Sequence, residues 1–348
     1  MNFFFRVDSS RSIGFGHVMR CLVLAEKLRL ADANVFFVCK SYEHSLIPKI
    51  KNSNFTVITL NNIPLKFKEE LLSNELQIED ARMTIDAIKE FQIDWLIVDS
   101  YLLGVEWQIK MREVAKKIMV IDDLAESKHY CDLLLNQNSN ELELNYKESL
   151  NKEFIGLFGP GYSLLRDEFL MLRPKKLEPI AEIKSILIFL SGGDDYGETL
   201  KAMRGVWKYK KNVEADVVIG SSNLYASEIK DLCQQYHWNL LVQIDNLAER
   251  MANADFVVGS CGVNAWERCA LGKPSISVVL ASNQKYVSKT LKKYDASEVI
   301  GWFEDASHEE YCNIMKKMTK ERAFEIANNA YNLVDANGAN RVSDILLN

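Results

Sequence analysis

The chain has 348 residues, of which 48% are hydrophobic and 26% are charged, and its formal net charge is −6. This length exceeds the roughly 100–200 residues typical of one domain, so two domains are expected. The mildly acidic balance argues against nucleic acid or an acidic membrane surface as a partner, although a local site could still hold a small anion.

Seven cysteines are scattered along the chain without the close pairing of a zinc site or a disulfide framework. The N-terminus has no signal-peptide pattern, and no window approaches the roughly 20 apolar residues of a membrane span. We therefore expect a cytoplasmic protein with reduced thiols and no membrane span.

The first motif is an apolar run that ends at Asp8 and is followed by a glycine-containing loop and an amphipathic stretch. This order predicts a strand, a loop and a helix. Gly14 and Gly16 allow backbone conformations with positive φ and let a ligand approach the backbone, while His17 falls in the first turn of the helix. A dinucleotide-binding fingerprint would need a third glycine where this chain has Met19, so that function is disfavoured.

The first half of the chain continues as short β-branched or aromatic runs that alternate with helical patterns. Such alternation predicts a parallel sheet with helices on both faces. The helix after the glycine loop should pack one apolar stripe on this sheet, because its apolar residues recur at steps of three and four. The candidate strands are residues 3–7, 35–39, 55–60, 95–99 and 118–122.

Polar residues follow several of these strands and should therefore lie at the carboxyl edge of the sheet. One strand ends at Asp99 and Tyr101, and the next ends at Asp122 and Asp123. A further apolar run ends at residues 136–138. The two adjacent aspartates either hold a catalytic base in the correct tautomer or cap a following helix, which is the commoner role.

Glycine, proline and charged residues replace the apolar pattern between residues 158 and 179, which predicts a domain boundary. The expected organisation is an N-terminal domain at 1–172, a C-terminal domain at 173–335, and a terminal helix in 336–348 that packs back on the first domain. The second half again alternates, and both halves are expected to be α/β Rossmann-like domains with parallel sheets and a ligand cleft between them. Its candidate strands are residues 185–190, 215–219, 240–243, 256–258 and 275–279.

A second glycine loop, Ser191-Gly192-Gly193, follows the first strand of the second half. Backbone N–H groups in such a loop, together with a helix N-terminus, can bind a diphosphate without a metal. The alternative is a simple tight turn. Asp194 and Asp195 would repel phosphate, so we expect them to cap the next helix.

These motifs resemble a known family. Residues 14–22 and residues 259–274 are similar to the corresponding stretches of the UDP-2,4-diacetamido-2,4,6-trideoxy-β-L-altropyranose hydrolases of pseudaminic acid biosynthesis. The resemblance implies the two-domain glycosyltransferase-B architecture, release of UDP by water attack at the anomeric carbon with inversion and C–O cleavage, and His17 as the catalytic base. It also implies that the small-molecule partner is a UDP-sugar and that no cofactor takes part.

The resemblance assigns UDP to the second domain. Ser191, Gly192 and Gly193 would hold the diphosphate, and Glu267 would accept hydrogen bonds from both ribose hydroxyls, as a carboxylate can. The alternative for Glu267 is a surface helix on which it pairs with an arginine, whereas Trp266 and Cys269 are expected in the core.

The resemblance assigns the sugar to residues of both domains. Asn283 and Gln284 would line the sugar end, although Asn283 could equally cap a helix, and Arg166 would neutralise diphosphate charge unless it pairs with Asp167 or Glu168. The remaining predicted contacts are Asp8, Gly14, Gly16 and Tyr101. The family usually has a histidine between the residues that match Asp99 and Tyr101, where this chain has Ser100.

The chain is thus expected to be a hydrolase of a UDP-activated deoxyaminosugar. Two alternatives remain open, a glycosyltransferase with the same donor site and a UDP-sugar binding protein without turnover. No clustered histidines or carboxylates predict a metal.

Overall fold

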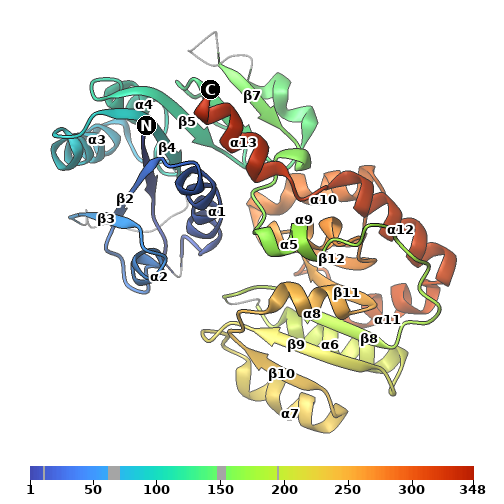
Figure 1. Ribbon diagram of the computed structural model, residues 1–348. Helices are drawn as coiled ribbons and strands as arrows, with labels where there is room; N and C mark the ends of the chain where they lie inside the picture. Colours follow the sequence, from blue (N-terminus) through green and yellow to red (C-terminus); the bar gives the residue numbers. More distant parts are fainter. Residues whose placement is uncertain (11, 62–70, 147–153, 194–195) are drawn as a thin grey trace. The chain divides into compact units, whose positions relative to one another are not determined.

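The computed structural model describes residues 1–10, 12–61, 71–146, 154–193 and 196–348. The chain divides into two compact units (Figure 1). The first unit comprises Met1–Leu164 and Gly338–Asn348, and the second comprises Leu165–Asn337.

The first unit is built on a seven-stranded sheet in the order β3-β2-β1-β4-β5-β6-β7, in which every strand pair is parallel. Strand β1 lies inside the sheet and is almost fully buried and, apart from Asn2 and Arg6, apolar, as expected for a parallel sheet that is covered on both faces. The strands are β1 (Asn2–Val7), β2 (Asn34–Lys40), β3 (Thr56–Leu60), β4 (Ile93–Asp99), β5 (Ala115–Ile121), β6 (Leu133–Asn136) and β7 (Ile155–Phe158).

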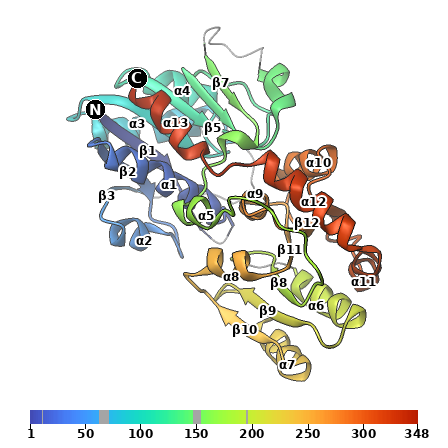
Figure 2. The same ribbon diagram turned by 45° about the vertical axis from the view of Figure 1, so that its right-hand side comes forward.

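Helices α1 and α13 cover one face of this sheet and lie side by side in both views (Figures 1 and 2). The predicted stripe of α1 is buried in one core cluster with alternate residues of β1 and with Val342 and Leu346 of α13. The helices of the first unit are α1 (Gly16–Leu30), α2 (Ile47–Asn52), α3 (Asn74–Ile88), α4 (Val105–Met111) and α13 (Gly338–Leu347), with 3-10 turns η1 (Asn140–Tyr146) and η2 (Pro160–Tyr162).

The second unit has a six-stranded parallel sheet in the order β10-β9-β8-β11-β12-β13. Its strands are β8 (Ser185–Phe189), β9 (Glu214–Ile219), β10 (Asn239–Val242), β11 (Phe256–Ser260), β12 (Ser275–Val279) and β13 (Glu298–Trp302). Its helices are α5 (Asp167–Leu172), α6 (Glu198–Tyr209), α7 (Ala226–Tyr236), α8 (Leu247–Asn253), α9 (Val263–Ala270), α10 (Lys285–Lys293), α11 (His308–Lys317) and α12 (Lys320–Leu333), with the 3-10 turn η3 (Ser282–Gln284).

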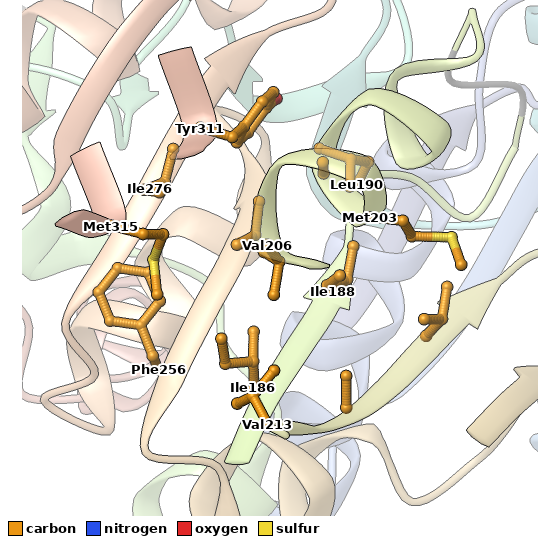
Figure 3. Close-up of a cluster of buried hydrophobic side chains, with 14 of the residues drawn as sticks. Ile186, Ile188, Leu190, Met203, Val206, Val213, Phe256, Ile276, Tyr311 and Met315 are labelled. Atoms are coloured by element: carbon orange, nitrogen blue, oxygen red, sulfur yellow. The ribbon is translucent and has the colours of Figure 1, made fainter. Parts of the chain in front are cut away.

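Both faces of the second sheet carry a core. On one face, Ile186 and Ile188 of β8 pack with Met203 and Val206 of α6 and with Met315 of α11 (Figure 3). On the other face, Leu187 packs with residues of α5 and α8. Alternate residues of β8 thus serve opposite faces, which fixes the register of the strand.

The two parallel α/β sheets are the predicted fold, and every predicted strand is present. Strands β6, β7 and β13 lie outside the predicted ranges. The division between the units falls after Leu164 and not after residue 172, because Phe169 of α5 is buried against α8 and β8 of the second unit. The second division falls after Asn337, two residues beyond the expected one.

Candidate functional site

His17 is the second residue of α1 and is nearly buried. Its Nδ1 lies 2.6 Å from Oδ1 of Asp99, the last residue of β4. Strand β4 pairs with β1 so that Asp99 lies beside Val7, the last residue of β1. This pairing brings Asp99 to His17, from which it is separated by 82 positions in the sequence. Because an ionised carboxylate can only accept, Nδ1–H donates to Asp99 and the lone pair remains on Nε2.

Arg20, one turn further along α1, binds the same carboxylate through two hydrogen bonds. Its Nε donates to Oδ2 of Asp99 and its Nη2 to Oδ1, both at 2.6 Å. Burial alone would raise the pKa of Asp99, but the charge of Arg20 and the hydrogen bonds from Arg20 and His17 outweigh it and hold this pKa well below its usual range. Asp99 is therefore a permanent anion behind the imidazole.

Asp123 closes the cluster on the other side of Arg20. Both of its carboxylate oxygens accept from Nη1 of Arg20, at 2.8 and 2.9 Å, and they also accept from the Tyr101 hydroxyl at 2.6 Å and from Asn138 Nδ2 at 2.8 Å. The Tyr101 ring lies edge-on to His17, with ring centroids 4.7 Å apart. The predicted Tyr101 thus adjoins the predicted base.

Both roles considered for the adjacent aspartates are wrong. The carboxylate that orients His17 is Asp99, whereas Asp123 binds Arg20. Asp122 accepts from the backbone N–H groups of Leu124 and Ala125, in a turn and not at the start of a helix. Arg20 lies within the 14–22 motif, but no role was predicted for it, because its partners Asp99 and Asp123 are distant in the sequence.

Asp8 belongs to a separate buried cluster of charges. Its Oδ1 accepts from the backbone N–H of Lys40 at 2.7 Å and lies 2.7 Å from Nη1 of Arg6. The side chains of Arg6 and Lys40 both pair with Asp80. Burial would raise the pKa of Asp80, but these two cations lower it to about 2.

The glycines of the first loop leave room beside the backbone. Gly14 has a φ of 84°, which an L side chain rarely adopts, and Gly16 opens α1. A Cβ added at either glycine would meet no described atom within 4 Å. The first turn of α1 has no capping side chain at Phe15, so its first N–H groups have no partner from that residue.

In the second unit, the predicted diphosphate loop follows β8. Ser191 Oγ accepts from the backbone N–H of Gly193 at 3.0 Å. A Cβ added to Gly220, which follows β9, would overlap the carbonyl oxygen of Gly192, so the two backbones are in close approach. Asp194 and Asp195, the predicted helix caps, lie outside the described residues.

Glu267 is buried on α9 and lies 3.5 Å from Arg166. The alternative of a surface helix is therefore wrong, while its pairing with an arginine is present. Burial raises the pKa of Glu267, and the charge of Arg166 partly offsets this rise. Arg166 also contacts Glu168 at 2.5 Å, so the alternative ion pair of Arg166 is present too. Trp266 and Cys269 are core residues, as predicted.

Asn283 and Gln284 lie in η3, directly after β12. Gln284 Oε1 accepts from the N–H of Leu280 at 2.9 Å, and its Nε2 lies 3.5 Å from the position of a Cβ on Gly262, at the start of α9. Helix α10 begins after Gln284 without a capping side chain, so Asn283 does not cap it. The loops after β8, β11 and β12, which are neighbouring strands, thus carry the predicted residues at one edge of the sheet.

Three general features complete the description. Within the part of the chain that the structure describes, no group of three or more histidines, cysteines and acids is arranged to hold a metal ion. No helix among the same residues is long and apolar enough to cross a membrane. All seven cysteines are buried and free of disulfides.

Comparison with known proteins places this geometry in context. No protein-family model matches the chain. An uncharacterized protein of Methanocaldococcus jannaschii is 29% identical over 318 residues, which are 86% of this chain and 61% of that protein, so the chain spans about three fifths of this relative. The UDP-2,4-diacetamido-2,4,6-trideoxy-β-L-altropyranose hydrolase of Campylobacter jejuni is 27% identical over 297 residues, which are 84% of this chain and 97% of that protein. A spore coat polysaccharide biosynthesis protein of Bacillus subtilis is 22% identical over 97% of this chain and 96% of its own length.

Solved structures share the fold at low sequence identity. Acinetobacter baumannii MurG has a TM-score of 0.70 at 14% identity and covers 99% of both chains. The UDP-GlcNAc 2-epimerase of Neisseria meningitidis, bound to UDP-GlcNAc, has a TM-score of 0.66 at 13% identity and covers 100% of both chains. The solved structures thus confirm the glycosyltransferase-B fold with two Rossmann-like domains, and the sequence likeness confirms that this chain resembles the UDP-2,4-diacetamido-2,4,6-trideoxy-β-L-altropyranose hydrolases.

Proposed function

We propose that this protein is a hydrolase that releases UDP from UDP-2,4-diacetamido-2,4,6-trideoxy-β-L-altropyranose. The observation that carries the proposal is the hydrogen bond between His17 and Asp99, which lies beside an open glycine loop. The Campylobacter jejuni relative, which matches along most of both chains, carries the name of this activity.

His17 is the general base of the proposed reaction. Its Nε2 takes a proton from water while the water oxygen forms a bond to the anomeric carbon. The bond between that carbon and the diphosphate oxygen breaks, and UDP leaves with the electron pair, so the configuration inverts. The imidazolium that forms is stabilised by the adjacent Asp99 anion. A positioned general base of this kind typically raises the rate by about 10²–10⁴-fold.

UDP is held by the second unit in this proposal. The N–H groups of the 191–193 loop receive the diphosphate, and Glu267 accepts from the ribose hydroxyls. Arg166, which touches both Glu168 and Glu267, could turn to the diphosphate when UDP is bound. Asp8, Tyr101, Asn283 and Gln284 remain proposed sugar contacts.

Metal independence is part of the proposal, because the backbone N–H groups and Arg166 can neutralise a diphosphate that is already a good leaving group. Activity should persist in excess chelator. Loss of activity in chelator and its return with Mg²⁺ would contradict this part alone.

The decisive experiment is incubation of the protein with a panel of UDP-diacetamido-trideoxyhexoses without any acceptor, with release of UDP as the readout. His17→Asn should lower kcat by roughly 10²–10⁴ while UDP affinity is retained, the pattern of an interaction made in the transition state. His44→Asn is the matched control, since His44 is exposed, lies in the same unit and has a positive φ that asparagine tolerates.

Two outcomes would favour the other functions. UDP release that requires an added acceptor would identify a glycosyltransferase, since glycosyltransferases also have this fold. UDP-sugar binding without release under any condition would identify a binding protein.

A further inference from the structure

Arg268 is a buried guanidinium that the proposed reaction does not use. It lies on α9, and only 1% of its surface is exposed. Nη1 donates to Asn264 Oδ1 at 2.7 Å, while Nη2 donates to the carbonyl oxygen of Ser260 at 2.9 Å and to Ser277 Oγ at 2.8 Å. All three acceptors are neutral.

Among the described residues, the other two buried arginines are neutralised by acids, which makes Arg268 unusual. Arg6 pairs with two aspartates and Arg20 pairs with two others. Arg268 has no carboxylate within ion-pairing distance among the residues that the structure describes, and its buried Nε has no hydrogen-bond partner there. The acid next to it in sequence, Glu267, is in contact with Arg166.

A buried charge without an ion-pair partner is unfavourable, and burial lowers the pKa of Arg268 by more than the nearby Glu267 raises it. A hydrophobic residue of similar size could fill this space without that penalty. Stability of the fold therefore does not explain why a charge is present here. A bound anion would supply the opposite charge that Arg268 lacks at ion-pairing distance.

The position of Arg268 indicates where such an anion would bind. The guanidinium reaches the end of β11, and a Cβ added to Gly259 would overlap its Nη1. Its partner Asn264 lies within 3.4 Å of the carbonyl oxygen of Leu190, which directly precedes the 191–193 loop. Arg268 thus lies beneath the loops that follow β8 and β11.

We propose that Arg268 is a positioning residue for the diphosphate of UDP, acting as a buried positive charge behind these two loops. It does not touch the ligand. Instead, its charge favours the anion through the loops, and its hydrogen bonds to Ser260 and Asn264 hold the start of α9 in place. This inference rests on the proposed function, because it assumes that UDP binds the second unit.

The test compares the affinities for UDP and for uridine, which lacks the phosphates. Calorimetry gives the affinity for UDP, and displacement gives that for uridine. Arg268→Met should weaken UDP binding by roughly 10- to 100-fold, the scale of a charge interaction across several ångströms of protein, while uridine binding changes by less than about threefold. Arg268→Lys keeps the charge, so the ratio of the two affinities should stay within about threefold of the wild-type ratio.

Lys273→Met is the matched control. Lys273 is also a largely buried cation bound by neutral carbonyls, those of Ala252 and Ala254, but it lies where β11 and β12 begin, at the opposite edge of the sheet. Its loss should leave the ratio unchanged. If Arg268→Met does not fold, Arg268→Gln removes the charge while it keeps a donor, and the same ratio decides.

Equal weakening of UDP and uridine, or an unchanged ratio in a folded neutral variant, would overturn the role of Arg268. A wild-type protein that binds neither ligand and releases no UDP would instead contradict the proposed function, so the two failures are distinguishable.

Discussion

Replacement of Asp99 by asparagine tests the proposed base most sharply. Asp99 accepts three hydrogen bonds of 2.6 Å, one from His17 and two from Arg20. An amide has only one acceptor oxygen, and its NH2 group would face either Arg20 Nε, or both Arg20 Nη2 and His17 Nδ1. If the NH2 group faces His17, Nδ1 must accept, the proton moves to Nε2, and the base is lost.

We expect Asp99→Asn to lower kcat for UDP release by roughly 10²–10⁴, since both the tautomer and the stabilisation of the imidazolium are affected. The break in the buried pair with Arg20 should also cost about 3–5 kcal/mol in the free energy of unfolding, so thermal melts must accompany the assay. UDP affinity should stay close to that of the wild type, because the proposed UDP site lies in the second unit.

Asp132→Asn provides the control. Asp132 also pairs with an arginine, Arg112, but it lies where β6 begins, at the other edge of the same sheet. It should retain full kcat. A folded Asp99→Asn protein with kcat within about threefold of wild type, or with a raised KM and unchanged kcat, would refute the reasoning and move the base to another residue.

Three further predictions concern binding and stability. Glu267→Ala should weaken UDP binding by about 1.5–3 kcal/mol in calorimetry, the scale of charge-assisted hydrogen bonds, and unchanged affinity would remove Glu267 from the ribose. Gly220→Ala should displace the Gly192 carbonyl and weaken UDP binding more than uridine binding. If the substitution changes both affinities equally, the 191–193 loop does not bind the diphosphate. The pKa of Asp80 falls to about 2 on folding, so its ionised form should contribute stability that is present above about pH 4 and lost as the pH falls towards 2. The melting temperatures of the wild type and Asp80→Asn should therefore converge as the pH falls over that range. A constant difference between the two melting temperatures would argue against this linkage.

Most of the fold followed from hydrophobic pattern. The central strands are short and apolar, and their burial on both faces makes them visible in the sequence. Of the three strands outside the predicted ranges, β7 and β13 each lie at an edge of a sheet and contain a glycine, and much of β13 is only half-buried. The third, β6, is buried between β5 and β7 but has only four residues. Pattern alone carries little information on such strands. The boundary expected near residue 172 differs from the observed one because α5 lies within the stretch whose composition predicts a linker, yet it packs with the second unit.

The site was predictable only in part. His17 was found because it follows a glycine loop, which is a local signal. Asp99 was recognised as a carboxyl-edge residue, but its contact with His17 depends on which strands are neighbours, and the order of strands is not written in the sequence. Arg20 was missed for a related reason, since it is a helical residue whose partners Asp99 and Asp123 lie far away in the sequence.

The path of the chain through α13 has a consequence for synthesis. The second unit is one uninterrupted segment, whereas the first is completed by residues 338–348, which bury Val342 and Leu346 in its core. Domains that emerge early from the ribosome can usually fold first. Here the order is reversed in part: the unit whose first segment is translated first must wait for residues 338–348 before its core closes, and the unit that carries the proposed UDP site can be finished earlier.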